Sequence, residues 1–124
     1  MKVVIIDNEK DVRRVARLTL EKVGGFQVAE AASGREGVEL VEKEQPDAVI
    51  LDVMMPEDDG PATLALLRAR PALAHIPVVF MTAKVMASEI ARLKALGAAG
   101  VLVKPFNPAT LCTELQEILR SAAS

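Results

Sequence analysis

Short, mostly apolar runs alternate five times with amphipathic segments along this chain of 124 residues. The runs are rich in β-branched residues, which is typical of strands buried on both faces of a parallel sheet. They are Val3–Ile6, Phe26–Glu30, Asp47–Leu51, Pro77–Met81 and Gly100–Val103. Between them, apolar residues recur at spacings of three and four, as in helices that pack one face on a sheet. The pattern predicts an α/β fold, a doubly wound parallel sheet with helices on both faces.

We expect the whole chain, residues 1–124, to form one domain with a core from about residue 3 to residue 119. This length is sufficient to bury a core without disulfides. No linker, repeat or low-complexity segment divides the chain. The single cysteine, Cys112, excludes an internal disulfide and a metal cluster held by several thiolates.

The composition is that of a soluble globular protein, 51% hydrophobic and 26% charged. The apolar runs are too short to span a membrane, and the chain does not start with a signal peptide, so we expect a cytoplasmic protein. A net charge of -2 and the absence of Trp and Tyr argue against direct nucleic-acid binding, which needs basic patches or stacking aromatic rings.

Polar side chains follow four of the five predicted strands at the point where each strand ends. They are Asp7 and Asn8, Asp52, Thr82 and Lys104. The carboxyl ends of parallel strands meet at one edge of a sheet, where ligands bind in open α/β folds, so these side chains should lie together. Carboxylate and amide oxygens suit Mg²⁺, and a hydroxyl and an ammonium can hold phosphoryl oxygens. The cation would remove the repulsion between Asp52 and an anionic phosphoryl donor.

Each of these residues has a simpler interpretation when it is taken alone. Asp7 and Asn8 could cap the helix that follows them. Asp52 could start a turn, and Thr82 could be an ordinary strand residue. Lys104 could be a solvated strand end. Their placement at successive strand ends favours a joint site over these alternatives.

Five short motifs occur in order along the chain: Ile6–Glu9, Leu51–Pro56, Asp59–Gly60, Met81–Ala83 and Val103–Phe106. With them the sequence resembles the receiver domain of two-component response regulators, of the chemotaxis-regulator type. The resemblance extends from Val3 to about Leu119. It implies a flavodoxin-like (βα)5 domain with the strand order 2-1-3-4-5. It also implies a cis peptide bond between Lys104 and Pro105.

The resemblance implies a phosphoacceptor and a metal site. Asp52 matches the aspartate that takes phosphate from a histidine on a kinase or a histidine phosphotransfer protein. Asp7 matches one of two acids that hold Mg²⁺, and Asn8 stands at the position of the second. The backbone carbonyl of Met54 matches a further metal ligand, together with Asp52 itself.

The resemblance also assigns the residues that contact the phosphoryl group. Thr82 matches the switch hydroxyl and Lys104 the lysine that contacts the phosphate. Ala83 matches the small residue that leaves room for the phosphoryl group. We therefore expect a signalling domain that switches its binding to a protein partner. It would not be an enzyme beyond the Mg²⁺-dependent phosphorylation and dephosphorylation of its own Asp52.

Two positions depart from the family pattern. Asn8 brings no charge to the metal site, so weaker Mg²⁺ binding is expected than in relatives with two acids. Val101 stands where many relatives carry a Tyr or Phe that rotates inward on phosphorylation. Switching should then depend on Thr82 and the loop after it, or on another surface. These departures leave open an interaction module of the same fold that works without phosphate.

Two further classes of protein share features with this sequence. A phosphohydrolase with an aspartyl-phosphate intermediate would need an acid or base two residues after Asp52, where Met54 stands. A flavodoxin would need a Ser/Thr/Gly-rich phosphate loop after the first strand and aromatic residues beside the flavin. The residues Arg13, Arg14, Arg17 and Leu18 on the first helix form either a solvated face or a docking face for the phosphodonor.

Overall fold

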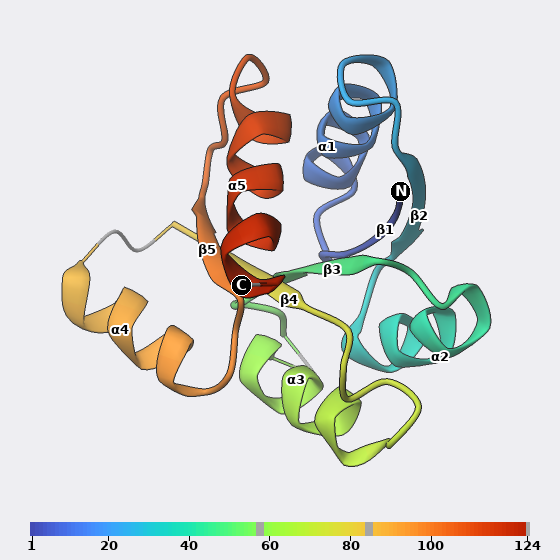
Figure 1. Cartoon of the computed structure of the whole chain (residues 1–124), viewed down its shortest axis with the longest axis vertical. Helices are drawn as coiled ribbons and strands as arrows, with labels where there is room; N and C mark the ends of the chain where they lie inside the picture. The colour runs from blue at the N-terminus through green and yellow to red at the C-terminus, as the bar shows by residue number, and fades with distance from the viewer. Residues whose placement is uncertain (57–58, 84–85, 124) are drawn as a thin grey trace.

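The computed structural model describes residues 1–56, 59–83 and 86–123, and of Ala123 only the backbone. Within these residues, strands and helices alternate along the chain (Figure 1). The strands are β1 (Lys2–Ile6), β2 (Gln27–Ala31), β3 (Ala48–Asp52), β4 (Val78–Thr82) and β5 (Gly100–Val103). The helices are α1 (Lys10–Lys22), α2 (Gly34–Glu44), α3 (Gly60–Ala69), α4 (Ala87–Ala95) and α5 (Leu111–Ala123).

The strands form one parallel sheet with the order β2-β1-β3-β4-β5, which confirms the predicted topology. Helices α1 and α5 pack on one face of the sheet, and α2, α3 and α4 pack on the other (Figure 1). Alternate strand residues supply the two cores, so Ile50 packs with α1 and α5 while Val49 and Leu51 pack with the opposite helices.

The central strands β3 and β4 are buried along their whole length, as their continuous apolar runs predict. The strand β2 at the edge of the sheet is only partly buried. Three of the predicted strands, β2, β3 and β4, lie one residue further along the chain in the structure, and β1 begins one residue earlier. The shifts at β3 and β4 matter for function. Asp52 and Thr82 are the last residues of β3 and β4 rather than the first residues of loops.

Side chains cap the N-termini of two helices, α2 and α3. Ser33 Oγ accepts a hydrogen bond from the backbone N–H of Glu36 at 3.2 Å at the start of α2. Asp59 Oδ1 accepts from Ala62 N at 2.8 Å at the start of α3. A turn over residues 108–110 precedes α5, although Asn107 and Pro108 are residues typical of a helix start. In the described part of the chain, the helices are too short or too polar to cross a bilayer.

Candidate functional site

The register of the sheet brings the predicted polar residues to one edge. Asp52 pairs with Met81 on β4, and Thr82 pairs with Val103 on β5. Asp7 directly follows β1, whose last residue pairs with Leu51. The side chains of Asp7, Asp52 and Thr82 are buried at this edge, with exposures of 0%, 3% and 2%. Burial of two neighbouring carboxylates is costly and therefore needs a compensating cation.

Lys104 supplies the first compensating charge. Its Nζ lies 2.9 Å from Asp7 Oδ2, 3.1 Å from Asp52 Oδ1 and 3.5 Å from Glu9 Oε1. The peptide bond that follows, between Lys104 and Pro105, is cis, as expected. Three ionised carboxylates around one ammonium leave a formal charge of -2, so the cluster is still under-compensated.

The pKa values of the site reflect burial and this shared charge. Burial raises the pKa of Asp52, and the charge of Asp7 raises it further, while the hydrogen bond and charge of Lys104 oppose both effects. Burial alone would lower the pKa of Lys104, but its contacts with Asp7 and Asp52 outweigh burial and raise it. The ammonium therefore stays protonated beside the two carboxylates.

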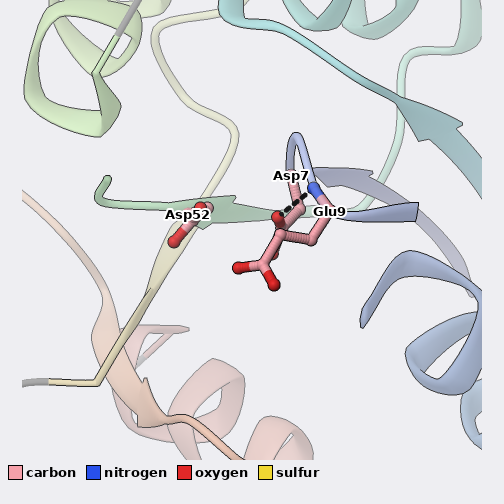
Figure 2. A group of neighbouring side chains, drawn as sticks. All are labelled: Asp7, Glu9 and Asp52. Atoms are coloured by element: carbon pink, nitrogen blue, oxygen red, sulfur yellow. Dashed lines mark hydrogen bonds between the residues drawn. The ribbon is translucent and has the colours of Figure 1, made fainter. Parts of the chain in front are cut away.

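The cluster offers an oxygen-only set of ligands for a divalent cation. One carboxylate oxygen each of Asp7, Glu9 and Asp52 lies within 4.8 Å of the others (Figure 2). Within the described residues, the buried Oδ2 atoms of Asp7 and Asp52 accept no hydrogen bond, although Asp7 Oδ2 lies in the ion pair with Lys104. A buried acceptor without a hydrogen bond costs about 1–3 kcal/mol. These oxygens therefore fit Mg²⁺, which prefers carboxylate ligands.

Two predicted metal ligands lie beside this cluster. Asn8 is exposed in the loop between Asp7 and Glu9. The backbone N–H of Met54 donates to Asp52 Oδ1 at 3.4 Å, and its side chain is exposed. Metal ligation by the Asn8 amide and by the Met54 carbonyl stays a prediction.

Glu9 is the site residue that the sequence reasoning did not single out. Its backbone N–H donates to Asp7 Oδ1 at 2.8 Å, and this turn brings its side chain back over the end of β1 (Figure 2). The spacing of Glu9 two residues after Asp7 could have identified it. An Asp side chain commonly accepts a hydrogen bond from the backbone two residues later, which forms a turn at the strand end.

A hollow of about 410 Å³ lies beside the carboxylates, between the start of α1 and the loop after β5. It is lined by Glu9, Asp11, Val12, Val15, Ala83, Lys104, Pro105 and Phe106. Most of this lining is apolar, and Ala83 and Lys104 connect it to the strand ends. The site therefore has an open, largely hydrophobic approach from the side of α1.

Arg13 ties the loop after β1 to the neighbouring strand β2. Its Nη1 donates to the carbonyl of Asp7 at 2.7 Å, and its Nε donates to Glu30 Oε1 at 3.1 Å. Arg17 Nη1 donates to Glu30 Oε2 at 3.0 Å. Burial alone would raise the pKa of Glu30, but the hydrogen bonds from Arg17 and Arg13 outweigh it and lower the pKa. These two arginines are therefore structural contacts rather than a purely solvated face.

The chain is similar to two groups of curated proteins. It is 37% identical over 120 residues to the "Probable transcriptional regulator ycf27" of Guillardia theta, covering 96% of this chain and 45% of that protein. The chain thus spans about half the length of the curated ycf27 relatives. It is 33% identical over 118 residues to the chemotaxis protein CheY-3 of Vibrio cholerae, covering 95% of this chain and 91% of that protein.

Solved structures and a family model agree with these similarities. The chemotaxis response regulator CheY4 of Vibrio cholerae superposes with a TM-score of 0.87 at 34% identity, covering 94% of this chain and 97% of that chain. Residues 3–116 match the family model described as the response regulator receiver domain. The fold, the strand-end site and this match lead to one conclusion: the chain belongs to the receiver domain family of two-component response regulators.

Proposed function

We propose that this chain is the phosphoacceptor of a two-component phosphorelay, with Asp52 as the phosphorylated residue. The supporting observation is the contact of Lys104 Nζ with both Asp52 and Asp7, at 3.1 Å and 2.9 Å, while Asp52 Oδ2 accepts no hydrogen bond from the described residues. This arrangement leaves the lone pairs of Asp52 Oδ2 available to attack phosphorus. It also holds the ammonium of Lys104 where negative charge would develop on a phosphoryl group.

The transfer is a displacement at phosphorus. An oxygen of Asp52 attacks the phosphoryl group of a phosphohistidine, the P–N bond breaks, and the imidazole leaves with the electron pair. Lys104 stabilises the charge on the phosphoryl oxygens, and Thr82, at the end of the next strand, offers its hydroxyl to another of them. Ala83 leaves space because its side chain is a single methyl group. Catalysis of this kind depends on positioning and charge, so the domain acts only on its own Asp52.

The receiver domain family binds Mg²⁺ at an acidic pocket, and the residues of this chain fit that role. Asp7 and Asp52 would hold the ion, together with the predicted Asn8 side chain and Met54 carbonyl. When bound, Mg²⁺ neutralises the carboxylates and so reduces their repulsion toward an anionic phosphoryl donor.

Phosphorylation would change the surface of the domain through a local change of charge. The phosphoryl group would draw Lys104 and Thr82 toward Asp52 and so alter the loops that they anchor. Val101 is half-buried against the core below α4 and carries no ring that could rotate. Switching is therefore assigned to Thr82 and the adjoining face of α4 and β5, where Val103, the partner of Thr82 in the sheet, is exposed.

The phosphodonor is a histidine kinase or a histidine phosphotransfer protein that docks beside the hollow. Leu18 and Val15 on α1 are 49% and 46% exposed, although Val15 falls in the apolar pattern of the helix. Val15 also lines the hollow together with Phe106. An amphipathic helix of the donor could cover this surface and place its phosphohistidine over Asp52. A protein with this role would act in the cytoplasm and would not need direct contact with nucleic acid or membrane.

Intact mass spectrometry tests the proposal. The protein is incubated with Mg²⁺ and acetyl phosphate or phosphoramidate, and the expected result is a mass gain of one phosphoryl group. The gain should disappear in Asp52→Asn and persist in Asp11→Asn, whose exposed side chain lines the same hollow. A gain that persists in Asp52→Asn would refute the assignment. Equal binding of a target by wild type and Asp52→Asn would favour the module that works without phosphate.

A further inference from the structure

We propose that Glu9 supplies the second carboxylate that Asn8 lacks, so that Mg²⁺ is held by three acids: Asp7, Glu9 and Asp52. The proposal rests on the proposed function only in taking Mg²⁺ as the ion of the site. The sequence analysis expected weaker Mg²⁺ binding because Asn8 carries no charge. In the proposal, the second negative charge is present but stands at Glu9, one residue further along the loop.

The first argument is the position of Glu9 at the start of α1. Glu9 is the N-cap residue of the helix, yet its side chain makes no capping hydrogen bond within the described structure. Ser, Thr, Asp and Asn are favoured at this position, and loss of such a cap costs about 1 kcal/mol. The Glu9 carboxylate instead extends toward Asp7 and Asp52, where all three offer an oxygen within 4.8 Å of the others (Figure 2).

The second argument comes from the buried oxygens that face this space. Asp7 and Asp52 are 0% and 3% exposed, and within the described residues neither Oδ2 accepts a hydrogen bond. Lys104 offsets only one of the three carboxylate charges. The remaining formal charge of -2 equals the charge that one divalent cation brings. Glu9 is needed for this balance, because Asp7, Asp52 and Lys104 alone would leave a formal charge of only -1.

The third argument is that Glu9 is free to turn toward a metal. Its Oε1 lies 3.5 Å from Lys104 Nζ, the longest of the three lysine contacts, and its side chain is 60% exposed. A contact of this length whose acid is exposed contributes less than the two shorter, more buried contacts of Lys104 and is screened more strongly by salt. The Glu9 carboxylate can therefore leave Lys104 and bind Mg²⁺ instead. Lys104 is then available to contact a phosphoryl group. The backbone does not have to move, because the Asp7–Glu9 turn already places the side chain.

Calorimetric Mg²⁺ titration of the full chain without a phosphodonor tests the proposal. Glu9→Gln should weaken Mg²⁺ binding about tenfold or more, the effect of removing one supporting group from a metal site. The control is Asp11→Asn, an exposed acid of the same hollow, which should change the affinity less than about threefold through long-range charge. An equal loss in both variants, or none in Glu9→Gln, would overturn the proposal.

Asn8→Asp provides a second and independent measurement. If Glu9 fills the role of the missing acid, Asn8→Asp should strengthen Mg²⁺ binding much more in the Glu9→Gln background than in wild type. An equal gain in both backgrounds would contradict the proposal. Thermal unfolding in EDTA should show that Glu9→Gln is at least as stable as wild type, since it removes a like charge. A folding defect there would mean that Glu9 has a structural role.

These measurements do not depend on phosphorylation of Asp52. Loss of Mg²⁺ binding in Glu9→Gln, combined with no phosphorylation of the wild type, would refute the proposed function and leave the metal assignment intact. Phosphorylation of Asp52 with unchanged Mg²⁺ affinity in Glu9→Gln would refute the metal assignment alone.

Discussion

The ammonium of Lys104 lies 3.1 Å from Asp52 Oδ1, although Asp52 ends β3, Lys104 directly follows β5, and β4 lies between these strands. The contact exists because the sheet register brings the ends of β3, β4 and β5 to one edge, where the long lysine side chain reaches the acids. The contact links the proposed phosphoacceptor to the end of β5. A change of charge at Asp52 therefore acts directly on Lys104, which begins the loop that leads to α5.

Lys104→Met should destabilise the metal-free protein by about 2–3 kcal/mol. Removing the ammonium leaves Asp7 and Asp52 buried side by side, and the loss of one partner from a buried ion pair costs about 3–5 kcal/mol when burial is complete. The lysine side chain is 14% exposed, so a somewhat smaller effect is expected. Urea unfolding with and without Mg²⁺ measures it, and Mg²⁺ should reduce the difference from wild type. The exposed Lys94→Met is the control, and equal losses in both variants would contradict the argument.

Arg13→Met should lower the stability by about 1–2 kcal/mol and also weaken Mg²⁺ binding. The guanidinium holds the carbonyl of Asp7 and the carboxylate of Glu30, and hydrogen bonds to charged groups contribute about 1.5–3 kcal/mol. Without it, the loop that carries Asp7 loses its tie to β2. Arg17→Met, on the same helix and paired with the same Glu30, should cost about 0.5 kcal/mol and leave Mg²⁺ binding unchanged. Identical Mg²⁺ affinities in the two variants would exclude a positioning role for Arg13.

Glu30 should make the stability depend on pH in the acid range. Its folded pKa is lowered from the ordinary value of 4.5, so the unfolded chain binds a proton more readily than the folded one. This contribution is complete above the ordinary pKa and is lost as the pH falls through the lower folded value. Glu30→Gln should therefore show a shallower loss of stability than wild type below about pH 4.5. Urea midpoints at several pH values measure the difference, and parallel curves would contradict the ion-pair explanation.

Leu18→Glu should slow phosphotransfer from a phosphohistidine protein about tenfold or more, because it places a charge in an apolar docking surface. Phosphorylation by acetyl phosphate should be unchanged, since that donor does not need the surface. Leu66→Glu is a matched control, because Leu66 on α3 is 50% exposed and Leu18 is 49% exposed. Any phosphohistidine protein that phosphorylates the wild type can serve as the donor. Equal rates in the two leucine variants would exclude docking at α1.

Charge reversal at Arg13 or Arg17 would be a poor test of the same surface. Both side chains hold Glu30, and Arg13 also holds the carbonyl of Asp7. A change there would disturb the loop that carries Asp7 as well as the proposed docking face. The exposed side chains of Arg14 and Leu18 separate the two effects.

The elements of the fold and most of the strand-end residues could be predicted from periodicity alone. A run buried on both faces, such as Ala48–Leu51, has few alternatives to a central strand. The strand order, in contrast, was implied by the resemblance to receiver domains. The helix pattern also placed Val15 among the apolar positions of α1, yet it is 46% exposed. A helical period identifies a face, but the width of the buried stripe depends on where β2 and α5 cover it.

The amino-acid sequence by itself determined that Asp7, Asp52, Thr82 and Lys104 would meet at one edge of a parallel sheet. Every strand of a parallel sheet ends at the same edge, so polar residues placed at successive strand ends are sufficient for that conclusion. Only the tertiary structure decided which acids share the cluster and what supports them. The Glu9 carboxylate reaches Asp52 through a turn closed by Asp7, and the Arg13 guanidinium reaches Glu30 across two elements. Long side chains have several rotatable bonds, so their positions depend on contacts with distant segments of the chain. The spacing of residues in the sequence cannot predict those positions.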